Sequence, residues 1–206
     1  MEITYYGANC VKIANKKASI VIDDTLQANG KKPITTDKDI VLITNKDLAV
    51  KKGGVFVIDC PGDYGVGEVE VAGMPTPLHI DESKHGVLYL VHIDGFSVAV
   101  IGHSIASLTE EQIEFLGIVD VLIVPVGGNG YTIDATAAVK LIKEINPKIV
   151  IPTHYQDSAV SYEVEQAPLE VFTKLFGVPE FEPLPVRKVK DSNLPEKTQL
   201  CVLEVR

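Results

Sequence analysis

The sequence predicts an α/β (α+β) fold with a strand-rich first half and a second half that alternates strands and helices. Two observations support this prediction. Short apolar runs rich in valine and isoleucine recur through residues 11–101, and turn residues separate them. From residue 109 onward, apolar residues at helical spacing alternate with short continuous apolar runs typical of buried strands.

The turns of the first half are indicated by their residue types. Asp94-Gly95 lies between two strand-like runs and is the strongest hairpin signal in the chain, because both residues tolerate positive φ. Residues 15–17 form a second short hairpin loop by the same reasoning. Residues 61–65, Pro-Gly-Asp-Tyr-Gly, are predicted to be a turn between two further strands.

Three helices are predicted in the second half. Thr109-Glu-Glu-Gln112 is a capping box, in which the threonine and glutamine side chains satisfy free N–H groups at a helix start. The second helix follows the spacing of Ala135 to Ile145 and stops before Pro147. The third contains Leu169 to Phe176 and ends at Gly177. Strands are predicted at 120–126, 148–152 and 199–205.

Composition excludes several classes of protein. The net charge of −9 disfavours a broad nucleic-acid-binding face, because an acidic surface repels phosphate backbones. Three cysteines lie far apart without a CxxC pair, which favours a reducing cytoplasm over a disulfide framework. No apolar run is long enough to span a bilayer and no leader peptide is evident, so we expect a cytoplasmic protein without membrane contact.

Four apolar strands each run into a polar loop. Sites in sheets with helical crossovers form outside the carboxyl ends of strands. If these strands are neighbours, Asp47, His103 and His154 converge, and His79 joins them from a further strand. The loops are Asn45–Asp47 after Ile40–Thr44, Gly102–Ser104 after Ser97–Ile101, Gly127–Tyr131 after Val121–Val126, and Thr153–Tyr155 after Ile149–Pro152.

Taken together, motifs along nearly the whole chain resemble the metallo-β-lactamase superfamily, and within it the small lactonase-like metal-dependent hydrolases. The resemblance implies a four-layer αββα sandwich, with two mixed sheets flanked by helices, formed by residues 1–206 as a single domain. The matching segments are Ile3–Gly7 with Cys10, Val21–Asp23, Pro61–Tyr64, Gly73–Thr76, Ile101–Gly102, Pro125–Gly128, Tyr131–Asp134 and Val150–Tyr155.

The chain departs from this family where the family binds metal. The family carries H-x-H-x-D-H after the strand that ends here at Thr44, and two metal ions held there activate a bridging water. The corresponding positions hold Asn45, Asp47, Ala49 and Val50, of which only Asp47 is a good ligand. The resemblance therefore implies a degenerate metal site.

Four candidate ligands survive, and the resemblance implies their positions. His103 replaces the family's bridging aspartate, His154 and His79 match later histidines (His79 with a shift of one position), and Asp47 remains in the loop. This set suffices for one zinc, manganese, iron or nickel ion. The alternative is no metal at all, with Asp47 capping a turn and the histidines making ordinary hydrogen bonds. Asp23 matches an aspartate that supports the metal loop through hydrogen bonds.

A small-molecule site is also predicted at the same strand ends. Gly128 and Asn129 lie in a glycine-rich loop that can present N–H groups to an anion, although a flexible loop before a helix is the more common explanation. Asn45 and Tyr131 complete the candidate substrate-binding residues.

Three functional hypotheses follow, and the sequence leaves catalytic activity undecided. The first is a binding or scaffold module that has lost the two-metal centre. The second is a metal-dependent hydrolase of lactones, esters or phosphoesters with a rebuilt single-metal site. The third is metal-free acid–base chemistry by His103 and His154. The partners left open are a small-molecule ligand and a second copy of the chain in a homo-oligomer.

Overall fold

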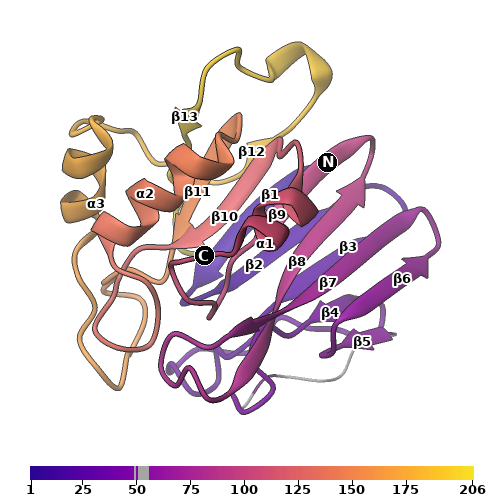
Figure 1. Ribbon diagram of the computed structural model, residues 1–206, viewed down its shortest axis with the longest axis horizontal. Coiled ribbons are helices and arrows are strands. Elements are labelled where there is room, and N and C mark those ends of the chain that lie inside the picture. The colour runs from indigo at the N-terminus through magenta and orange to yellow at the C-terminus, as the bar shows by residue number, and fades with distance from the viewer. Residues whose placement is uncertain (49, 51–55) are drawn as a thin grey trace.

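The computed structural model describes residues 1–48, 50 and 56–206, and these form two mixed β-sheets whose inner faces share one apolar core (Figure 1). One sheet has the order β12-β1-β2-β3-β4-β5, and the other β13-β11-β10-β9-β8-β7-β6. The first sheet consists of β1 (Glu2–Gly7), β2 (Cys10–Ala14), β3 (Ser19–Ile22), β4 (Ile40–Leu42), β5 (Phe56–Ile58) and β12 (Arg187–Lys188). The second consists of β6 (Gly62–Val66), β7 (Val69–Pro77), β8 (His85–Ile93), β9 (Phe96–Val100), β10 (Val121–Pro125), β11 (Ile149–Thr153) and β13 (Gln199–Leu200).

The predicted hairpins at 15–17 and at Asp94-Gly95 are confirmed. Asp94 and Gly95 have φ of 54° and 79°, and Ile93 pairs with Phe96 across the turn. The prediction of a turn at 61–65 was wrong, because residues 62–66 form strand β6 and pair with β7. An edge strand tolerates the glycines that made this segment read as a turn.

The three predicted helices are α1 (Glu110–Leu116), α2 (Ala135–Ile145) and α3 (Leu169–Phe176). Thr109 caps α1 with the predicted capping box, and Asp134 caps α2 by accepting from the Ala137 N–H. The predicted closing strand 199–205 is shorter than expected. Strand β13 ends at Leu200, and the residues beyond it make only isolated bridges.

Helices α1, α2 and α3 lie beside the seven-stranded sheet, where α2 contacts β10, α1 and α3 (Figure 1). A short 3₁₀-helix, η1 (Asp191–Asn193), follows β12 of the other sheet. A helical layer was expected on the outer face of the six-stranded sheet, but an irregular segment covers this face instead. There, residues 24–39 run without helix or strand, and Leu26 and Ile34 pack on Cys10 and Val21. The two mixed sheets are thus confirmed, while the described residues place a loop where the fourth layer was expected.

The sheets meet at the carboxyl ends of their strands, and this positions the site. Strands β9, β10 and β11 are parallel neighbours, as predicted. Strand β4 belongs to the other sheet, yet the Thr44 carbonyl after it accepts from the Val87 N–H of β8 at 2.9 Å. Among the described residues, no helix is long and apolar enough to cross a membrane.

Candidate functional site

Two of the predicted site residues, His103 and His154, lie side by side at this junction. Their rings approach edge to face, with centroids 6.1 Å apart and an interplanar angle of 84°. Both are buried, with 4% and 7% of their surface exposed. His103 follows β9, and His154 follows β11 with a left-handed φ of 53°. The His154 N–H donates to the Ala8 carbonyl at 2.8 Å, which fixes this backbone.

Both ring nitrogens of His103 have protein partners. Nδ1 lies 2.7 Å from the Thr44 hydroxyl oxygen, and Nε2 lies 3.2 Å from the Asn9 side-chain nitrogen. The Asn9 amide is oriented by Thr153, whose hydroxyl donates to Asn9 Oδ1 at 3.1 Å. The Asn9 NH₂ group therefore donates to Nε2, and the neutral ring carries its proton on Nδ1.

Thr44 connects His103 to a buried carboxylate. The Thr44 hydroxyl donates to Asp23 Oδ2 at 2.5 Å, and the Thr44 N–H donates to Asp23 Oδ1 at 2.8 Å. Asp23 Oδ2 also lies 3.5 Å from His103 Nδ1. Because the threonine proton goes to Asp23, its oxygen is left to accept from His103. Asp23 thus supports this loop, and the group it orients is Thr44.

Gly102 permits this close packing. It has a φ of 55°, and a Cβ placed there would lie 2.4 Å from the Thr44 hydroxyl oxygen. A side chain at this position would therefore displace Thr44 from both Asp23 and His103. The glycine before His103 is consequently required by the hydrogen-bond network as well as by its backbone conformation.

His154 keeps one ring nitrogen available. Nδ1 lies 3.2 Å from Gln166 Oε1, and Gln166 Nε2 donates to the Val164 carbonyl at 2.7 Å, which fixes the amide orientation. Nδ1 is therefore the donor, and Nε2 has no hydrogen bond to the described part of the chain. Burial, with a smaller contribution from nearby His103, lowers the pKa of His154 to about 4. The ring is neutral at pH 7 and presents a lone pair.

The two histidines line a cavity of about 140 Å³. One water occupies about 30 Å³ of liquid, so the space suits a small molecule. Tyr131 and Glu163 lie at its wall, where the tyrosine hydroxyl donates to the carboxylate at 3.2 Å. Beyond these four side chains, the lining consists of Thr25, Ala28, Asn29, Leu48, Tyr162, Val164 and Gln166.

The remaining predicted residues do not line this cavity. Asp47 is exposed and pairs with Lys84 at 2.8 Å, and this lysine lowers the pKa of the carboxyl. Asn45 is buried and its side-chain oxygen accepts from the Asp47 N–H, which makes a local turn. The His79 N–H donates to the His103 carbonyl, so these residues are linked through backbone.

The glycine-rich loop after β10 is held by its own contacts. The Gly128 N–H donates to the Ile133 carbonyl, and the Asn129 side chain donates to the Glu165 carbonyl. Of the four predicted substrate-binding residues, only Tyr131 reaches the cavity. Ala49, one of the altered loop positions, and Val55, a predicted strand residue, lie outside the described residues.

The donor set does not fit a two-metal centre. In the described ranges 1–48, 50 and 56–206, no group of three or more His, Cys, Asp and Glu side chains is close enough to hold a metal ion. His103 has both nitrogens engaged, so His154 Nε2 is the only imidazole lone pair of this pair that faces the cavity unpartnered. One nitrogen ligand is fewer than zinc or a related ion requires.

Several residues of the site escaped prediction from sequence. Thr44, Asn9 and Gln166 were not proposed, although each orients one of the two histidines. Thr44 and Asn9 stand beside positions where we predict that the family motif is altered, and that proximity is a usable signal. Gln166 lies in the irregular segment 156–168, where the residue pattern gives no signal.

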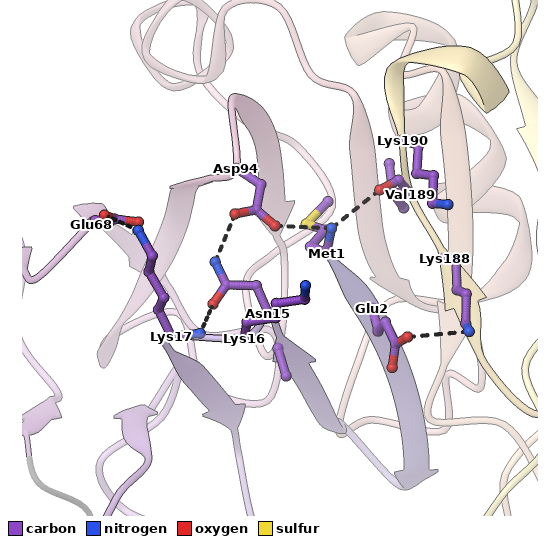
Figure 2. A pocket seen from close by; sticks show the side chains of 11 residues that line it. Met1, Glu2, Asn15, Lys16, Lys17, Glu68, Asp94, Lys188, Val189 and Lys190 are labelled. Carbon is purple, nitrogen blue, oxygen red and sulfur yellow. Dashed lines mark hydrogen bonds and ion pairs between the residues drawn. The ribbon is translucent and has the colours of Figure 1, made fainter.

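A larger cavity of about 560 Å³ lies at the opposite ends of the strands, near the start of β1 and the turn at Asp94 (Figure 2). Six of its charged groups form three ion pairs. Lys17 contacts Glu68 at 2.5 Å, Lys188 contacts Glu2 at 3.4 Å, and the Met1 amine contacts Asp94 at 3.0 Å. This cavity contains no histidine and is remote from the predicted site.

The fold and the position of the site define a metallo-β-lactamase-like protein. Over its full length the chain superimposes on 99% of a Thermotoga maritima structure, a candidate Zn-dependent hydrolase of the metallo-beta-lactamase superfamily, with a TM-score of 0.78 and 27% identity. Residues 2–154 match the family model described as the beta-lactamase superfamily domain, and the chain belongs to this family.

Two sequence relatives indicate which group of proteins within this family the chain is similar to. A Lysinibacillus sphaericus protein named UPF0173 metal-dependent hydrolase is 24% identical over 75% of this chain and 85% of its own length. A Pyrococcus furiosus protein of the same name is 30% identical over 63% of this chain and 58% of its own length. The predicted family is thereby confirmed at this level, while the degeneracy of the motif stays a prediction.

Proposed function

We propose that this chain is a member of the hydrolase family that binds a small molecule in the His103–His154 cavity and no longer carries a two-metal centre. The proposal unites the altered loop, in which Asn45 and Asp47 replace the first two histidines, with the geometry at the strand ends. In this protein a hydrogen-bonded chain from Asp23 through Thr44 to His103 stands where the family holds metal.

One observation supports this proposal above the others. His103, at the position of the family's bridging aspartate, uses one ring nitrogen toward Thr44 and the other toward Asn9. A ligand for metal must offer a free lone pair, and this ring has none in its neutral form. Turning the ring toward a metal would leave the buried Asn9 NH₂ group without its acceptor, which costs about 1–3 kcal/mol.

Elemental analysis tests the proposal. The protein is purified without chelator from cells supplied with zinc, manganese, iron and nickel, and bound metal is counted per chain. We expect far less than one ion per chain. Two tightly bound ions per chain would overturn the proposal. A Thr44→Val variant that then gained metal would also argue that the network, and not the missing ligands, blocks the site.

The second candidate is a metal-dependent hydrolase of lactones, esters or phosphoesters with a single-metal site. The names of the relatives favour it, since they are called metal-dependent hydrolases. The family model matches residues 2–154, a range that includes His154. It requires His79 and Asp47 to leave their present positions, Asp47 giving up its pairing with Lys84.

Zinc titration separates the two candidates. If the second holds, one equivalent of Zn²⁺ binds tightly, and the His154→Asn substitution abolishes both binding and hydrolysis. Asparagine suits position 154 because it tolerates the left-handed φ found there. The matched control is His92→Asn, a substitution of an exposed histidine on β8 that the cavity does not include. Loss of binding in both variants would indicate adventitious surface zinc.

A further inference from the structure

The described lining of the cavity offers hydrogen-bond acceptors and contains no lysine or arginine. We propose that it selects a small, flat ligand carrying N–H donors, either neutral or cationic, such as an amide or amidine, and that it rejects carboxylates. This inference rests on the proposed function, because a metal ion in the same cavity would attract anionic groups instead.

The first acceptor is His154 Nε2. The Val164 carbonyl accepts from the Gln166 side-chain nitrogen, and this contact turns Gln166 Oε1 toward His154. The ring must therefore donate from Nδ1, and Nε2 faces the cavity with a lone pair. The contacts from the Val164 carbonyl through the Gln166 amide to His154 therefore decide which ring nitrogen donates and which accepts, without a charged group among them. A ligand N–H completes it, whereas a carboxylate oxygen would face the lone pair directly.

The second acceptor is the Glu163 carboxylate at the cavity wall. Tyr131 supplies one donor to Glu163 Oε2, and the carboxylate has room for others, because two oxygens offer about four lone-pair directions. Among the residues that the structure describes, none that lines the cavity is lysine or arginine. Asp23 lies behind His103, at 3.5 Å from its ring, and adds negative potential on that side. An anion entering here would be repelled by these two carboxylates.

The remaining wall favours a flat, partly apolar ligand. Ala28, Leu48 and Val164 supply apolar surface. The Tyr162 ring lies 5.1 Å from the His154 ring at an interplanar angle of 44°, so an aromatic surface stands beside the acceptor. A planar group that donates N–H to His154 can contact this surface at the same time.

Three probes of one shape test the inference: benzamidine is cationic, benzamide neutral, and benzoate anionic. Each is titrated into metal-free protein while the ring signals of His154 are followed by NMR. Because a carboxylate would leave the buried His154 acceptor unpaired and would face the Glu163 carboxylate, we expect its Kd to exceed those of the other two probes by about tenfold or more. The Glu163→Gln substitution should reduce the preference for benzamidine over benzamide.

Every outcome bears on the inference. Binding of benzamidine and benzamide that disappears in His154→Asn, and persists in the exposed-site control His92→Asn, supports it. Benzoate binding as tightly as the other probes to metal-free protein overturns it and leaves the proposed function standing. A lack of response at His154 to all three probes also overturns it. Failure of the proposed function is recognised separately, by metal that copurifies with the chain.

Discussion

The Thr44→Val substitution tests the buried network most sharply. Valine has nearly the shape of threonine but neither donates nor accepts a hydrogen bond. In the native protein the Thr44 hydroxyl donates to Asp23 Oδ2 at 2.5 Å and accepts from His103 Nδ1 at 2.7 Å. Both partners are almost fully buried, at 0% and 4% exposed, so water cannot replace the lost hydroxyl.

The expected loss follows from three groups that lose this hydroxyl: Asp23 Oδ2, the His103 ring at Nδ1, and the His103 backbone N–H, which donates to the hydroxyl at 3.3 Å. An unsatisfied buried polar group costs about 1–3 kcal/mol, and a charged one more. Asp23 keeps its bond from the Thr44 N–H, and the added methyl group returns less than about 1 kcal/mol. We therefore expect the free energy of unfolding to fall by about 3 kcal/mol, a large part of the ~5–15 kcal/mol typical of a domain.

Urea denaturation of the wild type and two variants measures this loss. The matched control is Thr132→Val, because the Thr132 hydroxyl is also buried but has no hydrogen-bond partner in the described part of the chain. The control should unfold at the same urea concentration as the wild type, or a higher one. If Thr44→Val changed the free energy of unfolding by less than about 1 kcal/mol, the hydrogen bonds of Thr44 would add no more to stability than an ordinary surface contact does. Equal losses in both variants would have the same meaning.

Three further predictions concern single positions. Gly102→Ala should lower the free energy of unfolding by about 2 kcal/mol or more, because its Cβ would overlap Thr44; urea denaturation checks this, and an unchanged midpoint would contradict it. The folded-state pKa of His154, about 4, lies below the unfolded value, so the unfolded chain binds more protons between pH 4 and pH 6.5. Stability should therefore fall as pH drops through that window, by about 2 kcal/mol between pH 7 and pH 5, and His154→Asn should remove this part of the pH dependence in the same assay. Asp47→Ala should leave probe binding unchanged by NMR, because Asp47 is exposed and pairs with Lys84; weaker binding would place Asp47 in the site.

Local patterns predicted most of the fold because each rests on a strong local cause. The capping box at Thr109 and the Asp94-Gly95 turn each specify backbone geometry within a few residues. The strand at residues 62–66 was misread because Pro61-Gly62 is a turn signal, and only pairing with β7 makes the segment extended. The covering of the six-stranded sheet by residues 24–39 depends on packing that no local pattern encodes.

The candidate site was predictable only in part. The expectation that polar strand ends meet brought His103 and His154 together correctly. It could not assign partners, because Thr44 and Asn9 contact His103 across 59 and 94 residues of sequence. Asp47 follows the same strand as Thr44, yet an ion pair with Lys84 holds it outside the cavity. Sequence spacing indicates which loops meet, whereas side-chain competition decides which residues face the ligand.

The central claim is that protein hydrogen bonds occupy both ring nitrogens of His103, the residue that we predict to replace a metal ligand of the family. A long-range ¹H–¹⁵N NMR spectrum of the histidine rings, recorded before and after one equivalent of Zn²⁺, tests it directly. We expect a proton on His103 Nδ1, with Nε2 accepting from Asn9, and ring signals that zinc does not move. A His103 proton on Nε2, or a stoichiometric shift of its nitrogen signals on addition of zinc, would contradict the claim.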